Sequence, residues 1–203
     1  VLFRSSCRRG CRVTIRRGEP WGEPCVLDAA VVRADGDAAL AGIVTAARRT
    51  GSEVPTVAVV AGDLARTLGG GLPGRVVDGA HLVRAPVDVI RVTLDGGESS
   101  WCAAHVVVRR RWWRGPVVVV ANAQYLHGRD IAPRSHPNDG RLDVVEVAAS
   151  MTLRTRIRAW RRARTGTHLP HPQLTARQVE SAAWAFDRPM RVILDGQIGR
   201  AHV

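Results

Sequence analysis

The chain has 203 residues, of which 45% are hydrophobic, and a formal net charge of +12 at pH 7. This length suits one large domain or two small ones, and the hydrophobic content is ordinary for a globular core. No apolar run approaches the ~20 residues that span a bilayer. The four unevenly spaced cysteines form no paired zinc motif, and we expect reduced thiols, as in a cytosolic protein.

The positive charge comes entirely from arginine, because the sequence contains no lysine. Abundant Ala, Val, Gly and Pro accompany it, and this bias is typical of GC-rich coding DNA. The charge by itself therefore indicates a nucleic-acid partner only weakly.

Both ends of the chain read as non-native. Residues 1–5 and 198–203 translate the two strands of a common sequencing adapter, so we expect both segments to be adapter-derived. The natural chain would then be an internal fragment. The codon of Gln197 would also take its last two bases from the adapter, which leaves the native residue at that position open.

The first elements alternate between strand and helix. Short strands are predicted at Ala29–Arg33 and Val54–Ala61, and helices at Leu40–Arg48 and Leu64–Leu68. This order is typical of an α/β fold. We expect residues 6–74 to form a partial α/β nucleotide-binding domain.

The second part of the chain is rich in predicted strands. Val87–Leu94 and Trp101–Val108, joined by the turn Asp95-Gly96-Gly97, are expected to form a hairpin. Further strands are predicted at Val117–Ala121, Leu142–Val147, Val179–Phe186 and Met190–Leu194, and a helix at Ser150–Arg164. We expect residues 75–197, after a boundary near Gly74, to form a β-rich, sandwich-like domain.

Three segments carry a resemblance to a known family. Ala132–Val144 reads APRSHPNDGRLDV and follows Asn122, Asp63–Gly69 reads DLARTLG, and Asp195-Gly196 comes far downstream. Together they resemble the diacylglycerol kinase family, the soluble bacterial lipid kinases. The resemblance implies an α/β domain followed by a β-rich domain. It also implies transfer of a phosphoryl group from ATP, with Mg²⁺, to a lipid hydroxyl.

Two loops correspond to the nucleotide-binding loops of that family. Residues 35–40 read DGDAAL where the family has Gly-Gly-Asp-Gly-Thr-Leu, and residues 59–62 read VVAG in place of Gly-Thr-Gly-Asn. The resemblance places these residues at the nucleotide: Asp35, Gly36, Asp37, Ala38, Ala39, Val60, Gly62 and Asp63. Glycines let backbone N–H groups approach phosphates, whereas a carboxylate at Asp35 would repel them. These departures argue against ordinary ATP binding, and without the family the DGD segment predicts a simple turn. We also expect Asp63 to cap its helix.

The turn His136–Arg141 is the candidate metal site. Mg²⁺ prefers oxygen ligands, and the resemblance implies the Asp139 side chain together with main-chain oxygens of His136 and Arg141. The alternative is a β-turn in which Asp139 binds its own backbone.

Asp195-Gly196-Gln197 stands where the lipid kinases have Asp-Gly-Glu. The resemblance makes position 197 the general base for the lipid hydroxyl, but an amide cannot accept that proton. Asp195 is a candidate for a metal-linked network or a plain turn aspartate. The catalytic residues implied are therefore Gln197, Asp195 and Asp37.

The last motif is basic. Residues 109–114 read RRRWWR, and residues 154–164 carry six further arginines. Indoles beside guanidinium groups suit an anionic membrane surface or single-stranded nucleic acid, and the alternative is a solvated face whose tryptophans cover the core. We expect a lipid substrate, a cytoplasmic location and peripheral membrane contact, with nucleic acid an unlikely partner.

Three hypotheses follow. The first is an active lipid kinase that uses ATP and Mg²⁺. The second is a catalytically impaired relative that binds lipid or nucleotide, because both phosphate loops and the base are altered. The third is a basic nucleic-acid-binding protein.

Overall fold

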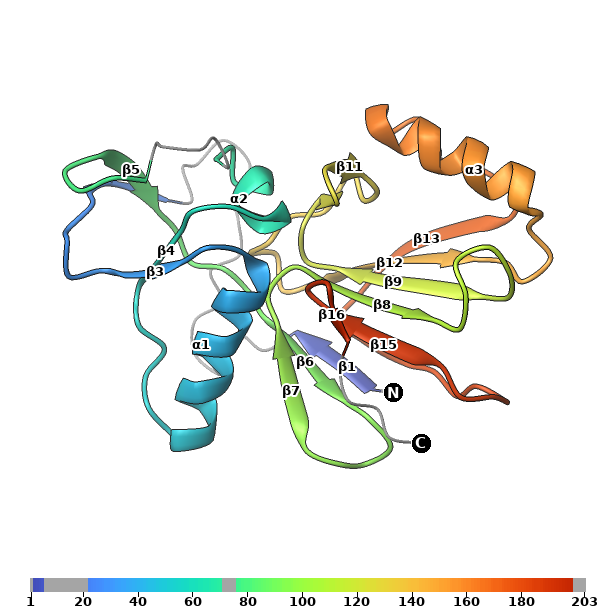
Figure 1. The fold of residues 1–203 in the computed structure, drawn as a ribbon, viewed down its shortest axis with the longest axis horizontal. Coiled ribbons are helices and arrows are strands. Elements are labelled where there is room, and N and C mark those ends of the chain that lie inside the picture. Colours follow the sequence, from blue (N-terminus) through green and yellow to red (C-terminus); the bar gives the residue numbers. More distant parts are fainter. Residues whose placement is uncertain (1, 6–21, 71–75, 199–203) are drawn as a thin grey trace.

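The computed structural model describes residues 2–5, 22–70 and 76–198. An α/β part lies at one end and a β-rich part at the other (Figure 1). This confirms the predicted fold class, a partial α/β domain followed by a β-rich, sandwich-like domain.

The α/β part is built on two short parallel strands, β3 (Val32–Ala34) and β4 (Val57–Val59). Helix α1 (Asp37–Thr50) connects them, as parallel pairing requires, and α2 (Asp63–Thr67) follows β4. Helix α1 buries Ala41, Val44 and Ala47 at helical spacing. The predicted elements are present, although the strands are shorter than the apolar runs and β3 begins later than expected.

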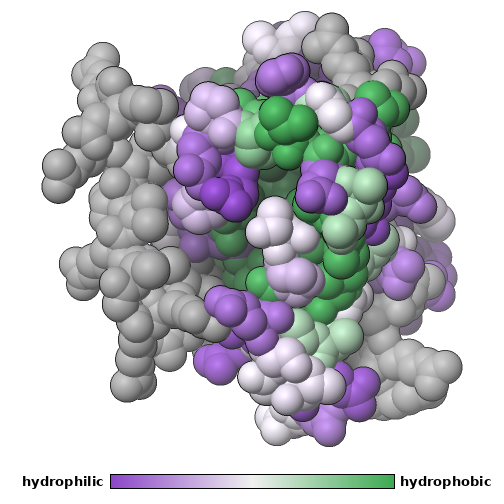
Figure 2. Space-filling model, turned by 90° about the vertical axis from the view of Figure 1, so that its left-hand side faces the viewer, coloured by the Kyte–Doolittle hydropathy of each residue, from purple (hydrophilic) through white to green (hydrophobic). Residues whose placement is uncertain are grey.

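A second pair, β2 (Glu23–Val26) and β5 (His81–Arg84), is antiparallel and was not predicted. Strand β5 lies beyond the boundary expected near Gly74, yet it pairs with a strand from the N-terminal side; the boundary stays a prediction. Val26 and Val83 of this pair are exposed. Figure 2 shows apolar surface gathered on the face at this end of the molecule.

A six-stranded antiparallel sheet forms the centre of the β-rich part. Its order is β13 (Leu174–Val179), β12 (Leu142–Val147), β9 (Val117–Ala121), β8 (His105–Arg109), β15 (Arg191–Leu194) and β16 (Gln197–Ile198). The strands at Val117–Ala121 and Leu142–Val147 have the predicted bounds. Runs of β-branched residues favour strands that are buried on both faces.

The two faces of this sheet pack against different partners. Val106 and Val108 of β8 belong to one core cluster, which includes Ile90, whereas Val107 belongs to another, which Trp160 borders. Successive residues of a strand point to opposite faces. The alternation therefore divides one valine run between two cores.

A four-stranded sheet covers the first of these faces. Its order is β14 (Ser181–Ala183), β1 (Leu2–Ser5), β6 (Ile90–Thr93) and β7 (Ser99–Cys102). The predicted hairpin is confirmed, since β6 and β7 pair antiparallel around the Asp95-Gly96 turn. Strand β1 comes from a segment predicted to be adapter-derived, and that prediction remains untested.

Two strand predictions were wrong. Trp101–Val108 is two strands, β7 and β8, in different sheets, because the chain turns at Ala103 and Ala104. Val179–Phe186 is not one strand, since β13 ends at Val179 and the short β14 lies in the other sheet and ends at Ala183. A continuous apolar run does not reveal where the chain changes sheets.

Helix α3 (Leu153–Arg162) packs on the other face of the large sheet (Figure 1). The Thr152 side chain accepts a hydrogen bond from the Thr155 N–H and so caps the N-terminus of α3. A 3₁₀ turn, Ala163–Thr165, ends at Gly166, which has a φ of 66°. Helix α3 lies within the predicted Ser150–Arg164.

Within the described ranges no helix has the length and apolar character needed to cross a membrane.

Candidate functional site

A polar pocket of about 410 Å³ lies where turns of the α/β part meet turns of the β-rich part. Its lining comprises Gly36, Asp37, Ala38, Gly62, Asp63, His105, Leu126, His127, Asp195 and Gly196. Each of these residues lies at or beside the end of a helix or strand, or in the short hairpin of β10 (Tyr125–Leu126) and β11 (Arg129–Asp130). The pocket gathers carboxylates from three separate segments.

The first carboxylate, Asp37, binds the start of helix α2. Its oxygens accept the backbone N–H groups of Asp63 at 2.7 Å and Leu64 at 3.2 Å. Gly62 has a φ of 111°, and a Cβ atom there would lie 2.7 Å from the Asp37 Cγ. Glycine is therefore required at position 62 both by backbone conformation and by the space that Asp37 occupies.

Burial raises the pKa of Asp37 to about 6, although the hydrogen bonds from Asp63 and Leu64 lower it. The nearby carboxylates of Asp195 and Asp63 add to the increase. This carboxylate titrates closer to neutral pH than an ordinary aspartate, because burial disfavours its charged form and two further acidic groups lie near it.

The second carboxylate, Asp63, joins the two parts of the molecule. It accepts the N–H groups of His127 at 2.7 Å and Gly128 at 2.9 Å, both in the β10–β11 turn. The prediction that Asp63 caps its own helix was wrong, because Gly62 holds the cap position and Asp37 supplies the acceptor.

The DLARTLG segment, Asp63–Gly69, provides a further contact between the α/β part and the β-rich part. Thr67 donates its hydroxyl to the Asp63 carbonyl at 2.8 Å and accepts the N–H of Gln124 at 3.0 Å. The contact of Thr67 that holds helix α2 against the β-rich part therefore explains part of the DLARTLG sequence pattern.

The third carboxylate, Asp195, organises the start of β8. It accepts the N–H groups of Ala103, Ala104 and His105 at 2.7 to 2.9 Å. Asp195 and Gly196 have φ of 47° and 81° and form the two-residue turn between β15 and β16. Positive φ at both positions is the geometry that an Asp-Gly hairpin turn adopts.

Gln197 lies on β16, opposite Leu194, and its side chain is exposed. It is not among the described residues that line the pocket. Asp35, Ala39 and Val60 also lie outside the lining, whereas Gly36, Asp37, Ala38, Gly62 and Asp63 belong to it. The structure thus brings together five of the eight residues predicted for the nucleotide.

His105 is a pocket residue that sequence reasoning missed. It is 3% exposed, and its Nε2 has no hydrogen-bond partner among the described residues. Burial lowers its pKa, while the charges of Asp63 and Asp195 oppose that shift. The imidazole has a hydrogen bond with the backbone of Ala123, which opposes the shift as well, so Nε2 is the ring nitrogen left in the wall of the acidic pocket. Its signal in the sequence is a lone polar residue that opens a valine run.

The candidate metal turn lies outside the pocket lining. Asp139 accepts the Arg141 N–H at 2.9 Å, which is the local backbone contact that the alternative interpretation predicts. The His136 Nδ1 accepts the Asn138 N–H at 3.3 Å. These contacts describe a turn and leave the roles of Asp139, His136 and Arg141 at a metal as predictions.

Asp88, also missed in the sequence, holds this turn in place. Its side chain accepts the Gly140 N–H at 2.8 Å, and its N–H donates to the Pro137 carbonyl at 2.7 Å. Burial raises the pKa of Asp88; the hydrogen bond from Gly140 lowers it, and the charge of Asp139 raises it again. Two carboxylates therefore share this turn.

Asn122 connects the turn with the pocket. Its Nδ2 donates to the carbonyls of Asp88 at 2.7 Å and Ala103 at 3.1 Å, and Ala103 in turn donates to Asp195. Its Oδ1 is buried and has no partner among the described residues.

The described residues contain no cluster of three or more His, Cys, Asp or Glu side chains arranged for a metal ion. A Mg²⁺ site needs fewer such side chains, because one or two carboxylates together with other oxygen atoms and waters can complete its coordination. Asp88, Asp139 and the unpartnered Asn122 Oδ1 are oxygen donors of the type that Mg²⁺ prefers.

Comparison with protein families gives one match in the β-rich part. Residues 80–201 match the family model described as the YegS C-terminal NAD kinase beta sandwich-like domain. The matched range includes His105, the turn of Asp139, and Asp195. No curated protein matches the chain.

Proposed function

Because the chain belongs to the family of the YegS C-terminal NAD kinase beta sandwich-like domain, a lipid- and NAD-kinase-like family, we propose that it is a diacylglycerol kinase-like lipid kinase. In this proposal it transfers the γ-phosphoryl group of ATP, with Mg²⁺, to the hydroxyl of a lipid alcohol. The observation that carries the proposal is the family match, joined to a polar pocket in which both candidate turns, at Gly36 and at Asp195, meet.

The reaction forms a bond between the lipid oxygen and the γ-phosphorus and breaks the bond to the β-phosphate oxygen. ADP leaves, and the hydroxyl proton passes to a base. Bound Mg²⁺ would neutralise charge on the phosphates. The first turn of α1, which opens at Gly36, presents unpaired backbone N–H groups that suit a phosphate.

The Asp139 side chain and main-chain oxygens of His136 and Arg141 would hold the metal. Asp88, which binds this turn, and Asn122 offer further oxygen atoms. Through Asn122 and Ala103 this group is connected to Asp195, and therefore to the pocket wall. The proposal gives Asp195 a positioning role, because its carboxylate is already engaged with three backbone N–H groups.

A catalytically impaired relative is the second candidate, and one observation favours it. Gln197 occupies the position where the resembled family has its general base, and its side chain is an exposed amide outside the pocket lining. An amide cannot accept the hydroxyl proton. In addition, Asp37 occupies the backbone N–H groups at the start of α2, so these groups are closed to a phosphate.

The experiment is phosphate transfer by the intact chain. The chain is incubated with γ-labelled ATP, Mg²⁺ and diacylglycerol in mixed micelles, beside a parallel reaction in which NAD replaces the lipid. Labelled phosphatidic acid that falls in Asp139→Ala, and not in Asp187→Ala at an exposed site, supports the proposal. Absence of lipid product above the Asp139→Ala background, or labelled NADP alone, rejects it.

A further inference from the structure

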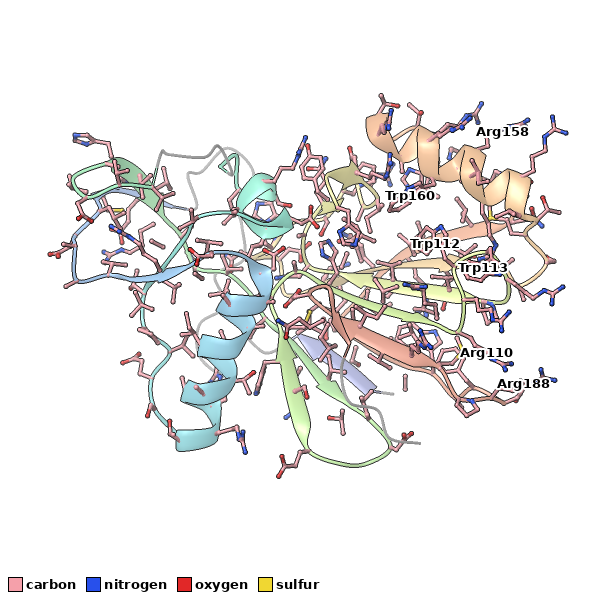
Figure 3. All side chains as sticks on the ribbon, viewed as in Figure 1. Arg110, Trp112, Trp113, Arg158, Trp160 and Arg188 are labelled. Carbon is pink, nitrogen blue, oxygen red and sulfur yellow. The ribbon has the colours of Figure 1, made fainter. Side chains whose placement is uncertain are left out.

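One surface of the β-rich part combines exposed apolar side chains with arginine. It lies at the end of the molecule farthest from the α/β part (Figure 3). We call it the arginine-tryptophan face. It consists of Arg110, Arg111, Trp113 and Arg114 in the β8–β9 turn, and of Leu153, Arg154, Ile157, Arg158 and Arg161 on α3.

The apolar members of this face are not part of the core. Trp113 is 54% exposed, Leu153 is 50% exposed and Ile157 is 44% exposed. Leu153 and Ile157 are four residues apart and so lie on one side of the helix. These three side chains are not needed to cover the core, because Trp112 and Trp160 of the same segments cover it.

The neighbouring tryptophans show the contrast. Trp112 packs edge-to-face on Trp160, with ring centroids 4.9 Å apart, and both border the core under α3. The guanidinium of Arg129 lies 4.5 Å from the Trp160 ring centroid. Trp112 therefore points toward the core under α3, whereas Trp113 points toward solvent (Figure 3).

The charge of the face is of one sign. The sequence has no Asp or Glu between Glu98 and Asp130, nor between Glu146 and Glu180, and these two intervals contain every residue of the face. The exposed arginines are thus not neutralised by acidic residues of their own segments. Such a surface attracts a polyanion.

Arg156 connects the β8–β9 turn with helix α3, so that the two form one surface. It is buried, and its guanidinium donates to the carbonyls of Met151 at 2.9 Å, Trp112 at 3.1 Å and Ala148 at 3.0 Å, and also to Gly115. The β8–β9 turn is therefore held against α3 before any partner arrives.

We propose that the arginine-tryptophan face docks on an anionic lipid bilayer. Indole and aliphatic side chains insert at headgroup depth, and guanidinium groups bind lipid phosphates. Exposed Leu153 and Ile157 favour a bilayer over nucleic acid, because single-stranded nucleic acid is bound by charge and aromatic stacking. An aliphatic side chain gains stability in a bilayer and not on a phosphate backbone.

The core under α3 extends to the wall of the polar pocket at one residue. An apolar cavity of about 60 Å³ separates α3 from the sheet, and Leu126 lines both this cavity and the polar pocket. The docking itself does not require phosphoryl transfer, so the two proposals can fail separately.

The test measures binding of the intact chain to vesicles without nucleotide. Vesicles of phosphatidylcholine are compared with vesicles that also contain phosphatidylglycerol, by co-sedimentation at low and high salt. We expect binding to the anionic vesicles alone, weakened by salt. Each arginine near an anionic surface contributes about fivefold to the partition coefficient, so Arg158→Gln with Arg161→Gln should lower it by more than tenfold.

Matched variants separate this face from general charge and hydrophobicity. Leu153→Ser with Ile157→Ser should weaken vesicle binding, whereas Val83→Ser, at another exposed apolar site, and Arg49→Gln, at another exposed arginine, should not. All of these side chains are exposed, so the fold should survive, and circular dichroism checks it. Equal losses in the control variants, or absence of vesicle binding, would overturn the proposal. Retention on single-stranded RNA that Leu153→Ser with Ile157→Ser leaves unchanged, without vesicle binding, would assign the face to nucleic acid.

Discussion

The Asp37 carboxylate accepts a 2.7 Å hydrogen bond from the backbone N–H of Asp63, a residue 26 positions later in the chain. Through this bond the first residue of α1 caps the first turn of α2. The capping acceptor of a helix is usually local. Here the α/β part uses a distant side chain, and the same carboxylate lines the pocket.

The first prediction concerns pH and Asp37. Its pKa rises from 3.8 to about 6 on folding. The folded chain therefore binds more protons than the unfolded chain between these values, and the contribution of Asp37 to stability falls as pH rises through that window. Urea unfolding at pH 4 and pH 7 measures this. Asp37→Asn should lose part of the pH dependence, and Asp35→Asn, at the exposed neighbour, should retain it. Identical pH dependence in all three proteins would contradict the assignment.

The second prediction concerns the Asp195 turn. Asp195→Asn removes a carboxylate that accepts three backbone N–H groups, and the new amide N–H₂ cannot replace it as an acceptor. Asparagine keeps one oxygen, so at least one of the three N–H groups loses its acceptor. Since leaving a buried donor unpaired costs about 1–3 kcal/mol, we expect the free energy of unfolding to fall by about that amount. Chemical denaturation measures the change.

Asp95→Asn is the matched control. Asp95 also lies in a hairpin turn, with a φ of 49° against 47° for Asp195. Asparagine tolerates this conformation as well as aspartate does, so the difference between the two variants reports the carboxylate. A loss of equal size in both would show that the turn conformation, and not the three hydrogen bonds, is responsible.

The third prediction restores a carboxylate at the position of the general base. If phosphoryl transfer is limited by the absence of a base, Gln197→Glu should raise the rate of lipid phosphorylation by about 10²–10⁴-fold, the usual contribution of a general base. The rate is measured with labelled ATP and diacylglycerol, and Gln173→Glu serves as the control. An unchanged rate would mean that position 197 does not reach the acceptor hydroxyl.

The fourth prediction concerns Arg156. Arg156→Ala would leave the carbonyls of Met151, Trp112 and Ala148 without their donor, and we expect a loss of about 3 kcal/mol. Arg158→Ala, on the exposed side of the same helix, should change the stability by no more than about 0.5 kcal/mol. Thermal and urea unfolding of the two variants test this. Similar stabilities would contradict the structural role of the buried guanidinium.

Sequence patterns located several elements because the cause of each element is local. Val117–Ala121 contains four valines in a row and Leu142–Val147 contains three valines, and β-branched residues favour strands in a buried sheet. Asp95-Gly96 and Asp195-Gly196 can adopt positive φ at low cost, and both form turns. The order of strand and helix likewise indicated the α/β part before the β-rich part.

The candidate site was only partly predictable. Gly36, Asp37 and Gly62 were found through the resemblance, and they do line the pocket. His105 and Asp88 were missed because each stands alone among apolar residues, and no spacing marks it. Asp63 was found, but its partner was not: its carboxylate binds the β10–β11 turn, and the helix that it begins is capped by Asp37.

By itself, the sequence determined the local conformations and the charge of the chain, since these depend on neighbouring residues alone. The tertiary structure decided which strands share a sheet, as at Ala103, where the hydrogen bonds to Asp195 divide one apolar run between two sheets. It also decided that Trp112 is packed against Trp160 while Trp113 is exposed beside the arginines. The physical reason is that hydrogen bonding and burial depend on contacts between distant segments, and these contacts exist only after the chain has folded.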